Sequence, residues 1–216
     1  MKVYIQSVPE RIQYVNQWMI PMLTATGLED VSFVVDHDHR GSQWNAARIW
    51  ELISKEETPG LVLQDDLILH SSFPIAFPET MTQFHALQMQ AMSLYAPARK
   101  AVDAAFQAGC NFIENYDFLW LQGIVLTPDF AAGLSRMVKG LYGKQLIQTD
   151  DTIVQWHVRE SGVPVWTTLP SLVQHNLEIK SALGHPSSIG GRPRSSRLWQ
   201  AIPIGHFAEM RSRIIR

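Results

Sequence analysis

"TPGLVLQDDLILHSSFP", residues 58–74, is the stretch that decides the fold. It places two adjacent acids, Asp65 and Asp66, between the apolar residues 61–63 and 67–69. A Pro-Gly turn signal precedes the run, so "LVLQ" is predicted to be a short buried strand that ends at the acids. Two neighbouring carboxylates in such an apolar setting repel each other and lose hydration. They therefore need a compensating partner.

Strand and helix signals alternate along the chain before this strand. In order, the patterns predict a strand over 2–8, a helix over 10–23 that Pro21 kinks, a strand over 31–35, a helix over 43–54 and the strand over 61–64. Strands that are separated by helices pair in parallel through right-handed crossovers. Runs that are apolar on both faces are typical of a sheet that helices cover. We therefore expect an α/β fold with a mostly parallel sheet flanked by helices.

The second half of the chain is less regular. Helices are predicted over 96–109, 127–141 and 149–162, strands over 118–127 and 163–176, and residues 85–95 fit a loop, a strand or a helix. From residue 187 the chain is rich in Gly, Pro, Ser and Arg. Because no repeat and no linker divides the chain, we expect one domain over residues 1–216.

The composition is that of an ordinary globular protein. The 216 residues are 46% hydrophobic and 18% charged, with a formal net charge of −2. This balance argues against binding nucleic acid by bulk charge, although it allows a local basic patch. The single cysteine, Cys110, excludes an internal disulfide and fits a reducing compartment. No apolar leader follows Met1 and no run approaches the roughly 18 residues of a membrane span. The expectation is a soluble, cytoplasmic protein.

Polar side chains follow each of the first three predicted strands, at Gln6-Ser7, at 36–41 and at 64–66. In parallel α/β sheets, ligands bind at the carboxyl ends of the strands. Mg²⁺ and Mn²⁺ take only one or two oxygen ligands from protein and leave the rest to phosphates and water. The acid pair therefore suggests a metal–diphosphate site, while the alternative is a pair of solvated acids that cap a turn.

The segment "RGSQWNAARIWELISKEETPGLVLQDDLIL", residues 40–69, resembles the nucleotide-sugar half of GT-A-fold glycosyltransferases. In that family a Gly-led helix with an Asn/Arg pair precedes a strand that ends in an acidic DXD-type motif. The resemblance covers residues 2–70 well and the remainder more loosely, and it departs from the family at Gln64, where many members have an acid. It implies a Rossmann-like nucleotide-sugar half over about 1–70, an acceptor half over about 71–186 and a basic tail or lid over 187–216.

The resemblance also assigns roles to individual residues. Asp66 would coordinate the Mn²⁺ or Mg²⁺ that bridges the donor diphosphate, and Asp65 would contact the ribose or the waters of the metal. Which of the two carboxylates ligates the metal directly stays open. His175, which follows a late strand, would complete the metal shell, although a structural role is the alternative for a lone histidine. The other donor-site residues would be Ser7, Asp36, Arg40, Asn45 and Arg48.

The segment "QTDDTIVQWH", residues 148–157, supplies a second acidic motif. In inverting members of the family, a carboxylate at a helix start deprotonates the acceptor hydroxyl. Asp151 is the favoured base and Asp150 the alternative, and adjacent acids can raise each other's pKa. Helix capping alone also explains both residues.

Other clusters carry weaker signals. Arg192, Arg194 and Arg197 fit a lid over the diphosphate, a patch for a polyanionic acceptor, or a solvated tail. His37 and His39 have a spacing that suggests a metal site only weakly. Most tryptophans are expected in the core. The rings of four of them could stack on a sugar or a base: Trp120, Trp156, Trp166 and Trp199.

The resemblance implies a metal-dependent transferase that moves a sugar from a UDP-sugar to a hydroxyl in one inverting displacement. Small enzymes of this type resemble those of bacteria and phages, so the acceptor would be a glycan or a hydroxymethylated pyrimidine in phage DNA. If the enzyme is phage-encoded, it would act in the host cytoplasm. One alternative is a sugar nucleotidyltransferase, although "QSVPERIQ" lacks the Gly-rich loop such enzymes carry after the first strand. The other is a non-catalytic protein that binds nucleotide sugars or nucleic acid.

Overall fold

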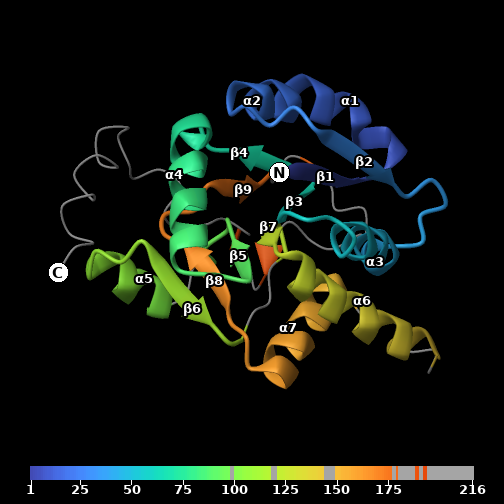
Figure 1. Ribbon diagram of the computed structural model, residues 1–216. Helices are drawn as coiled ribbons and strands as arrows, with labels where there is room; N and C mark the ends of the chain where they lie inside the picture. The colour runs from blue at the N-terminus through green and yellow to red at the C-terminus, as the bar shows by residue number, and fades with distance from the viewer. Residues whose placement is uncertain are drawn as a thin grey trace.

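The computed structural model describes residues 1–97, 100–117, 121–143 and 149–176, together with residue 179 and two short strands at 188–189 and 192–193. Its main sheet has seven strands in the order β2-β1-β3-β7-β5-β8-β6 (Figure 1). The strands are β1 (Lys2–Ser7), β2 (Val31–Val35), β3 (Gly60–Gln64), β5 (Ala91–Ser93), β6 (Phe112–Asn115), β7 (Gly123–Leu126) and β8 (Val165–Thr168). Two smaller antiparallel pairs are β4 (Leu67–Leu69) with β9 (Val173–His175), and β10 (Ser188–Ile189) with β11 (Arg192–Pro193).

The sheet is mixed. β1 pairs in parallel with β2 on one side and with β3 on the other, and β5 pairs in parallel with β8. β7 runs antiparallel to both β3 and β5, and β6 runs antiparallel to β8. The predicted α/β fold with a helix-flanked sheet is confirmed. Because β1, β2 and β3 are parallel, their carboxyl ends lie along one edge.

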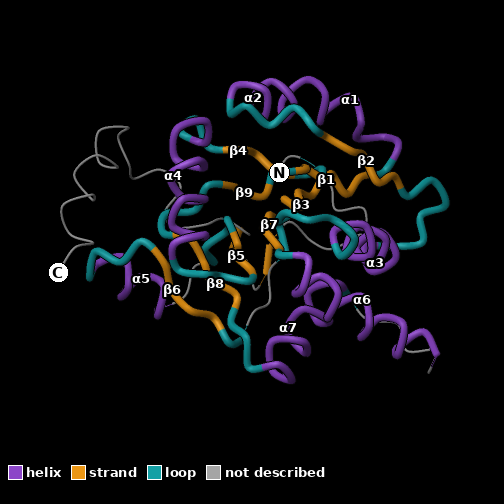
Figure 2. Tube along the Cα trace, in the orientation of Figure 1, coloured by secondary structure: helices purple, strands orange, loops and turns teal. Residues whose placement is uncertain are grey.

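Helices cover both faces of the sheet (Figures 1 and 2). One face carries a nearly continuous helical stretch, made of η1 (Pro9–Arg11), α1 (Ile12–Tyr14), the π-helical η2 (Val15–Met19) and α2 (Ile20–Ala25), and beside it α4 (Phe73–Ala86). The other face carries α3 (Ser42–Ile53), α6 (Pro128–Gly143) and α7 (Asp150–Ser161), while α5 (Lys100–Gln107) lies beside β6. No helix in the described part of the chain is long and apolar enough to cross a membrane.

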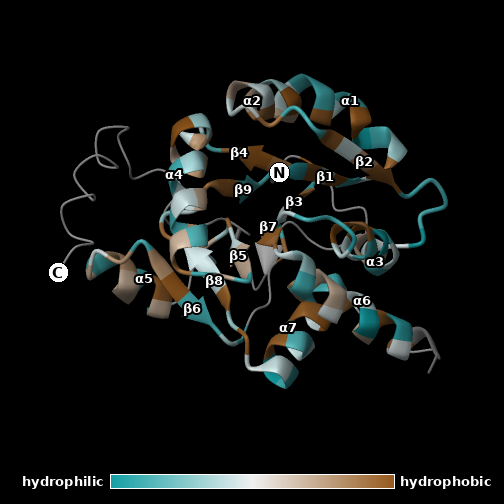
Figure 3. Cartoon of the chain, in the orientation of Figure 1, coloured by the Kyte–Doolittle hydropathy of each residue, from teal (hydrophilic) through white to brown (hydrophobic). Residues whose placement is uncertain are grey.

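Alternate residues of the central strands point into two separate cores. On β1, Val3 and Ile5 belong to the core under α2 and α4, whereas Tyr4 belongs to the core under α3, α6 and α7. β3 repeats this alternation, because Leu61 and Leu63 face the first core and Val62 faces the second. Figure 3 shows the consequence, with hydrophobic strands in the middle and hydrophilic stretches on the outer helices.

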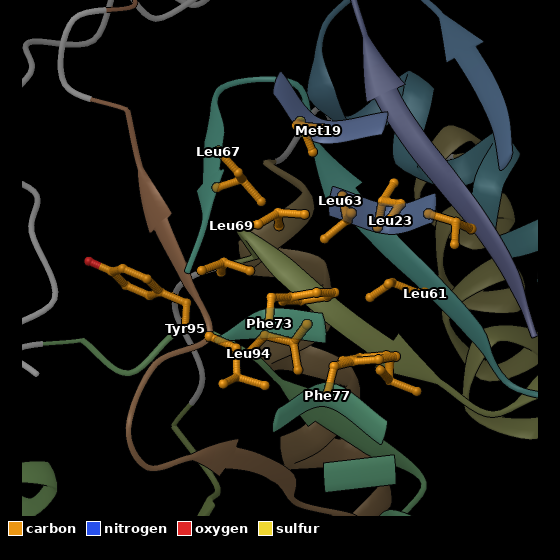
Figure 4. Close-up of a cluster of buried hydrophobic side chains, with 14 of the residues drawn as sticks. Met19, Leu23, Leu61, Leu63, Leu67, Leu69, Phe73, Phe77, Leu94 and Tyr95 are labelled. Atoms are coloured by element: carbon orange, nitrogen blue, oxygen red, sulfur yellow. The ribbon is translucent and has the colours of Figure 1, made fainter. Parts of the chain in front are cut away.

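The first core draws on elements that are distant in sequence (Figure 4). Phe73 and Phe77 of α4 stack with ring centroids 4.9 Å apart and meet side chains from η2, α2, β3 and β4. Each fully buried ring or leucine contributes roughly 1.5–3 kcal/mol through removal from water. This packing fixes the turn between β3 and β4, where the two acids lie.

The sequence patterns missed the helix α4 and the short strands β4 and β6, and they merged two other strands. α4 was not predicted because its segment contains Pro74 and Pro78, although Pro74 lies in the first turn, where a missing N–H costs nothing. The single strand predicted over 163–176 is β8 followed by β9. A π-helical turn, in which the N–H of Ile20 donates to the carbonyl of Val15, comes just before Pro21, where the sequence predicts a kink.

Candidate functional site

The acid pair lies in the turn between β3 and β4 and is held by an arginine. Nη1 of Arg11 lies 2.6 Å from Oδ1 of Asp65 and 3.4 Å from Oδ2 of Asp66. The backbone N–H of Val8 donates to the second oxygen of Asp65 at 2.9 Å. Both acids are buried, with exposed fractions of 5% for Asp65 and 8% for Asp66. The positive charge that offsets the repulsion between the two acids is therefore a guanidinium of the same chain.

His175, at the end of β9, provides the second partner of Asp66. Its Nε2 lies 3.2 Å from Oδ2 of Asp66, and the N–H of Asn176 donates to the backbone carbonyl of Asp66 at 2.7 Å. The predicted association of Asp66 with His175 is thus present because β4 and β9 pair side by side. Oδ1 of Asp66 and Nδ1 of His175 are buried and have no hydrogen-bond partner among the described residues.

The two acids differ in their electrostatics. Burial alone raises the pKa of Asp66, but the hydrogen bond and charge of His175, together with the charge of Arg11, bring that pKa below its ordinary value. Burial raises the pKa of Asp65 above its ordinary value, and Arg11 offsets this only in part. Of the two carboxylates, Asp66 is therefore the one whose ionised form the fold favours more strongly.

The second acidic motif comes to the same edge of the sheet. Thr149 caps α7 by accepting a hydrogen bond from the N–H of Thr152, which places Asp150 and Asp151 in the first turn. Oδ1 of Asp150 accepts from Oγ of Ser42 at 3.1 Å, and its Oδ2 accepts from Nε2 of Gln6 at 3.4 Å. The backbone carbonyl of Gln6 also accepts from the N–H of Asp65 at 3.0 Å. One residue of β1 therefore links the two acidic motifs.

Asp150 and Asp151 have different surroundings. Asp150 is 3% exposed, and burial raises its pKa against the opposing hydrogen bonds from Ser42 and Gln6. Asp151 is half-buried, and its Oδ1 accepts from the N–H of Leu121 at 2.5 Å. The side chain of Asp150 is thus buried and fixed by its hydrogen bonds, whereas Asp151 is the more accessible carboxylate.

Other predicted donor-site residues shape the loop between β2 and α3. The carboxylate of Asp36 accepts from the N–H groups of Arg40 and Gly41 at 2.9 and 2.7 Å. Gly41 has a φ of 103°, a conformation that side chains disfavour, and it lets the chain enter α3. Asn45 on α3 donates to the backbone carbonyl of Ser7 at 3.1 Å, which ties the start of the helix to the end of β1. Asp36, Asn45 and Ser7 are therefore gathered at the predicted edge, with side chains engaged in holding it.

Arg40 and Arg48 lie on the outer side of this segment. Each guanidinium carbon is 4.7 Å from the ring centroid of Trp44, and both arginines are exposed. Stacking on an indole orders a guanidinium while its N–H groups stay available. The pair thus presents two positive charges beside the start of α3.

The donor set fits a divalent ion that is shared with phosphates. Oδ2 of Asp66 and Nε2 of His175 are 3.2 Å apart, a spacing close to the roughly 3 Å between adjacent ligands of an octahedral ion. Oδ1 of Asp66 is a further buried oxygen donor. Asp65 does not fit, because both of its oxygens are engaged by Arg11 and Val8. Among the described residues, no group of three or more His, Cys, Asp or Glu side chains is arranged to hold a metal alone.

The remaining predicted residues lie elsewhere. His37 and His39 are exposed, and Nε2 of His39 lies 3.3 Å from Oε1 of Glu10. Trp166 packs at the edge of the first core, and Trp156 is half-buried. The side chain of Arg192 and all of Trp120, Arg194, Arg197 and Trp199 lie outside the described residues.

Sequence reasoning assigned no role to Arg11 or Ser42, and it placed Gln6 at the carboxyl edge without predicting its contacts to both acidic motifs. Arg11 is the first basic residue after β1, so its position at the carboxyl edge could have been inferred once the strand was assigned. Gln6 follows the apolar residues 3–5 of β1 and is buried, and its place at the carboxyl end of the strand is the one local signal of its role. Nothing in the sequence near Ser42 indicates its contact with Asp150, which is 108 residues away.

No protein-family model matches this sequence, and no curated protein matches it. Among solved structures, the chain is similar to a glucose-1-phosphate thymidylyltransferase from Bacillus anthracis, with 12% identity, a TM-score of 0.41 and coverage of 76% of this chain and 69% of that one. It is also similar to a UDP-glucose pyrophosphorylase complexed with UDP-glucose, with 10% identity, a TM-score of 0.42 and coverage of 78% and 90%. A third is a glycosyltransferase involved in glycosylation of the major capsid of PBCV-1, with 8% identity, a TM-score of 0.39 and coverage of 79% and 95%. Similarity at this level does not bear on function.

Proposed function

We propose that this protein transfers a glycosyl group from a nucleoside-diphosphate sugar, with a UDP-sugar as the favoured donor, to an acceptor hydroxyl. The observation that carries the proposal is the link through Gln6, whose carbonyl holds the N–H of Asp65 and whose side chain contacts Asp150. An acidic pair suited to a metal–diphosphate and an acidic helix start suited to proton abstraction therefore lie on one edge of the sheet.

The donor occupies the carboxyl edge of β1, β2 and β3 in this proposal. Ser7, Asp36 and Asn45 define the shape of that edge through their hydrogen bonds to backbone groups. Arg40 and Arg48 supply positive charge for the phosphates, because stacked guanidiniums bind phosphate oxygens in a bidentate manner.

Asp66 and His175 are the residues that would hold Mn²⁺ or Mg²⁺, and Asp65 positions Arg11 and the turn. A bound divalent ion neutralises charge that develops on the leaving diphosphate. The protein's own contribution is to hold Asp66 ionised and buried, so that the carboxylate is ready for a cation.

Asp151 is the base. The acceptor hydroxyl gives its proton to the carboxylate of Asp151 while its oxygen forms a bond to the anomeric carbon. The bond from that carbon to the diphosphate oxygen breaks, and the nucleoside diphosphate leaves with the electron pair. One displacement of this kind inverts the anomeric configuration. Asp150 fixes the first turn of α7 through Ser42 and Gln6, and so positions its neighbour.

The acceptor is a glycan or a hydroxymethylated pyrimidine in DNA, and the test treats the two as separate arms. Purified protein is incubated with Mn²⁺ and a panel of UDP-sugars, alone, with oligosaccharides, or with DNA that contains hydroxymethylated bases. Release of UDP that depends on one acceptor class supports the proposal and identifies the class. Turnover that survives Asp66→Ala contradicts the metal assignment. Formation of a nucleotide sugar from UTP and a sugar phosphate identifies a nucleotidyltransferase instead, and tight binding without turnover identifies a binding protein.

A further inference from the structure

The contact between Arg11 and the acid pair has a consequence for metal binding. The guanidinium lies between the two carboxylates, 2.6 Å from Asp65 and 3.4 Å from Asp66, and the side chain of Arg11 is only 12% exposed. A divalent cation that binds Oδ2 of Asp66 must occupy space within a few ångströms of this fixed positive charge. At such separations two cations repel each other strongly even with a protein-like dielectric.

Arg11 also changes the charge balance of the site. Without it, two buried carboxylates would attract a divalent ion strongly. With it, the two negative charges are already half neutralised, and His175 donates a further hydrogen bond to Asp66. Adding a divalent ion alone would leave an excess of positive charge in a buried place, which is costly.

A diphosphate removes this excess. It brings negative oxygens that bind a divalent ion, and a guanidinium matches two phosphate oxygens at once. Arg11 belongs to η1, which follows β1 directly, so it lies at the carboxyl edge where the donor is proposed to sit. Transfer of the guanidinium from Asp66 to the diphosphate would release the carboxylate for the metal in the same step.

We propose that Arg11 is a resident counter-ion that excludes a lone divalent cation from Asp66, so that metal and diphosphate bind only together. This inference rests on the proposed metal–diphosphate site and adds the residue that couples its two ligands. Coupling of this kind is reciprocal: UDP tightens metal binding by the same factor as the metal tightens UDP binding. Arg11 is a positioning residue in this scheme, because it acts through Asp66 and the diphosphate.

The test is an equilibrium titration of Mn²⁺, with unbound Mn²⁺ followed by electron paramagnetic resonance, with and without UDP. Wild-type protein is expected to bind Mn²⁺ weakly alone and at least tenfold more tightly with UDP. Arg11→Gln is expected to bind Mn²⁺ alone at least tenfold more tightly than wild type and to lose most of the UDP effect. Arg159→Gln is the matched control, since Arg159 forms a 2.7 Å ion pair with Asp117 on the exposed surface. It should behave as wild type.

Removal of Arg11 leaves two buried carboxylates without their cation, so stability is measured in parallel. Mn²⁺ should raise the melting temperature of Arg11→Gln by several degrees more than that of wild type, because the ion replaces the lost charge. If Arg11→Gln does not fold, Arg11→Lys provides the test. It keeps one positive charge but loses the planar guanidinium whose Nη1 contacts both acids, and it is expected to bind Mn²⁺ alone several-fold more tightly than wild type.

Equal Mn²⁺ affinities in wild type and the Arg11 variants would overturn the inference, and so would a lack of Mn²⁺ binding by every protein in the presence of UDP. The proposed reaction is judged separately, by UDP release from UDP-sugars. Turnover without coupling through Arg11 rejects this inference alone, whereas coupling without any turnover rejects the transferase and keeps the counter-ion role.

Discussion

Nε2 of Gln6 lies 3.4 Å from Oδ2 of Asp150, across 144 residues of sequence. The same amide nitrogen donates to the backbone carbonyl of Ser42 at 3.0 Å, so the end of β1, the start of α3 and the start of α7 are tied together. Oδ2 of Asp150 accepts from Gln6 and its Oδ1 accepts from Oγ of Ser42, so both oxygens help to orient the first turn of α7. Its neighbour Asp151 is then held in a fixed place with a more accessible carboxylate.

Replacement of Asp151 by Asn should abolish most turnover and leave donor binding unchanged. The amide keeps the size of the side chain but cannot take the acceptor proton, and general-base catalysis typically contributes 10²–10⁴-fold. We expect kcat to fall by at least about 100-fold, with the KM for the donor within about twofold of wild type. Asp129→Asn is the control, because Asp129 lies exposed in the first turn of α6. Equal losses in both variants would reject Asp151 as the base.

The two stacked arginines should contribute to donor binding and not to the chemical step. Arg40→Ala and Arg48→Ala each remove one guanidinium from Trp44. We expect the Kd for the UDP-sugar to rise by up to about tenfold in each, equivalent to about 1.4 kcal/mol, with kcat unchanged. Isothermal titration and steady-state kinetics measure the two quantities, and Arg159→Ala is the matched control. A fall in kcat with an unchanged Kd would contradict the assignment.

The first three strands were predictable because each carries a short apolar run that ends in polar residues. The acid pair stood out for the same reason, since Asp65 and Asp66 interrupt residues that must be buried. The sequence could not say that a guanidinium would balance these charges, because Arg11 reaches them only once β1 and β3 lie side by side. The contact is made across 54 residues, and no local pattern encodes it.

The second half was harder to predict for a different reason. β5 and β9 are three residues long, too short for an alternating pattern to show. His175 is placed beside Asp66 by the pairing of β9 with β4, a small sheet outside the main one. Its proximity to the acid was expected only from the family resemblance. Pairing between short strands depends on packing around them, which a single sequence does not display.

Gly133 on α6 should be intolerant of a side chain because of His157 on α7. A Cβ at position 133 would come within 2.5 Å of Nε2 of the imidazole. Gly133→Ala is therefore expected to lower the free energy of unfolding by about 1–3 kcal/mol, although alanine is the better helix former by roughly 1 kcal/mol. In a His157→Ala background the clash is absent, so the same substitution should become stabilising. Urea unfolding of the four proteins gives the double-mutant cycle, and an unchanged sign in the second background would contradict the packing argument.

His157 should also make the contact between α6 and α7 weaken at mildly acid pH. Burial lowers the pKa of His157 below its ordinary value of 6.5, and the charge of Arg136 lowers it further while Glu160 opposes the effect. The unfolded chain therefore binds the proton more readily, so this contribution to stability is complete above pH 6.5 and is lost as the pH falls below that value. Because the ring is half-buried and packs edge-on against Phe130, at 4.8 Å between centroids, the loss is expected to be on the order of 0.5 kcal/mol. Urea unfolding at pH 7.5 and pH 5.5 should show a larger drop for wild type than for His157→Gln, with the exposed His85→Gln variant following wild type. An equal drop in wild type and His157→Gln would show that this histidine does not set the pH dependence.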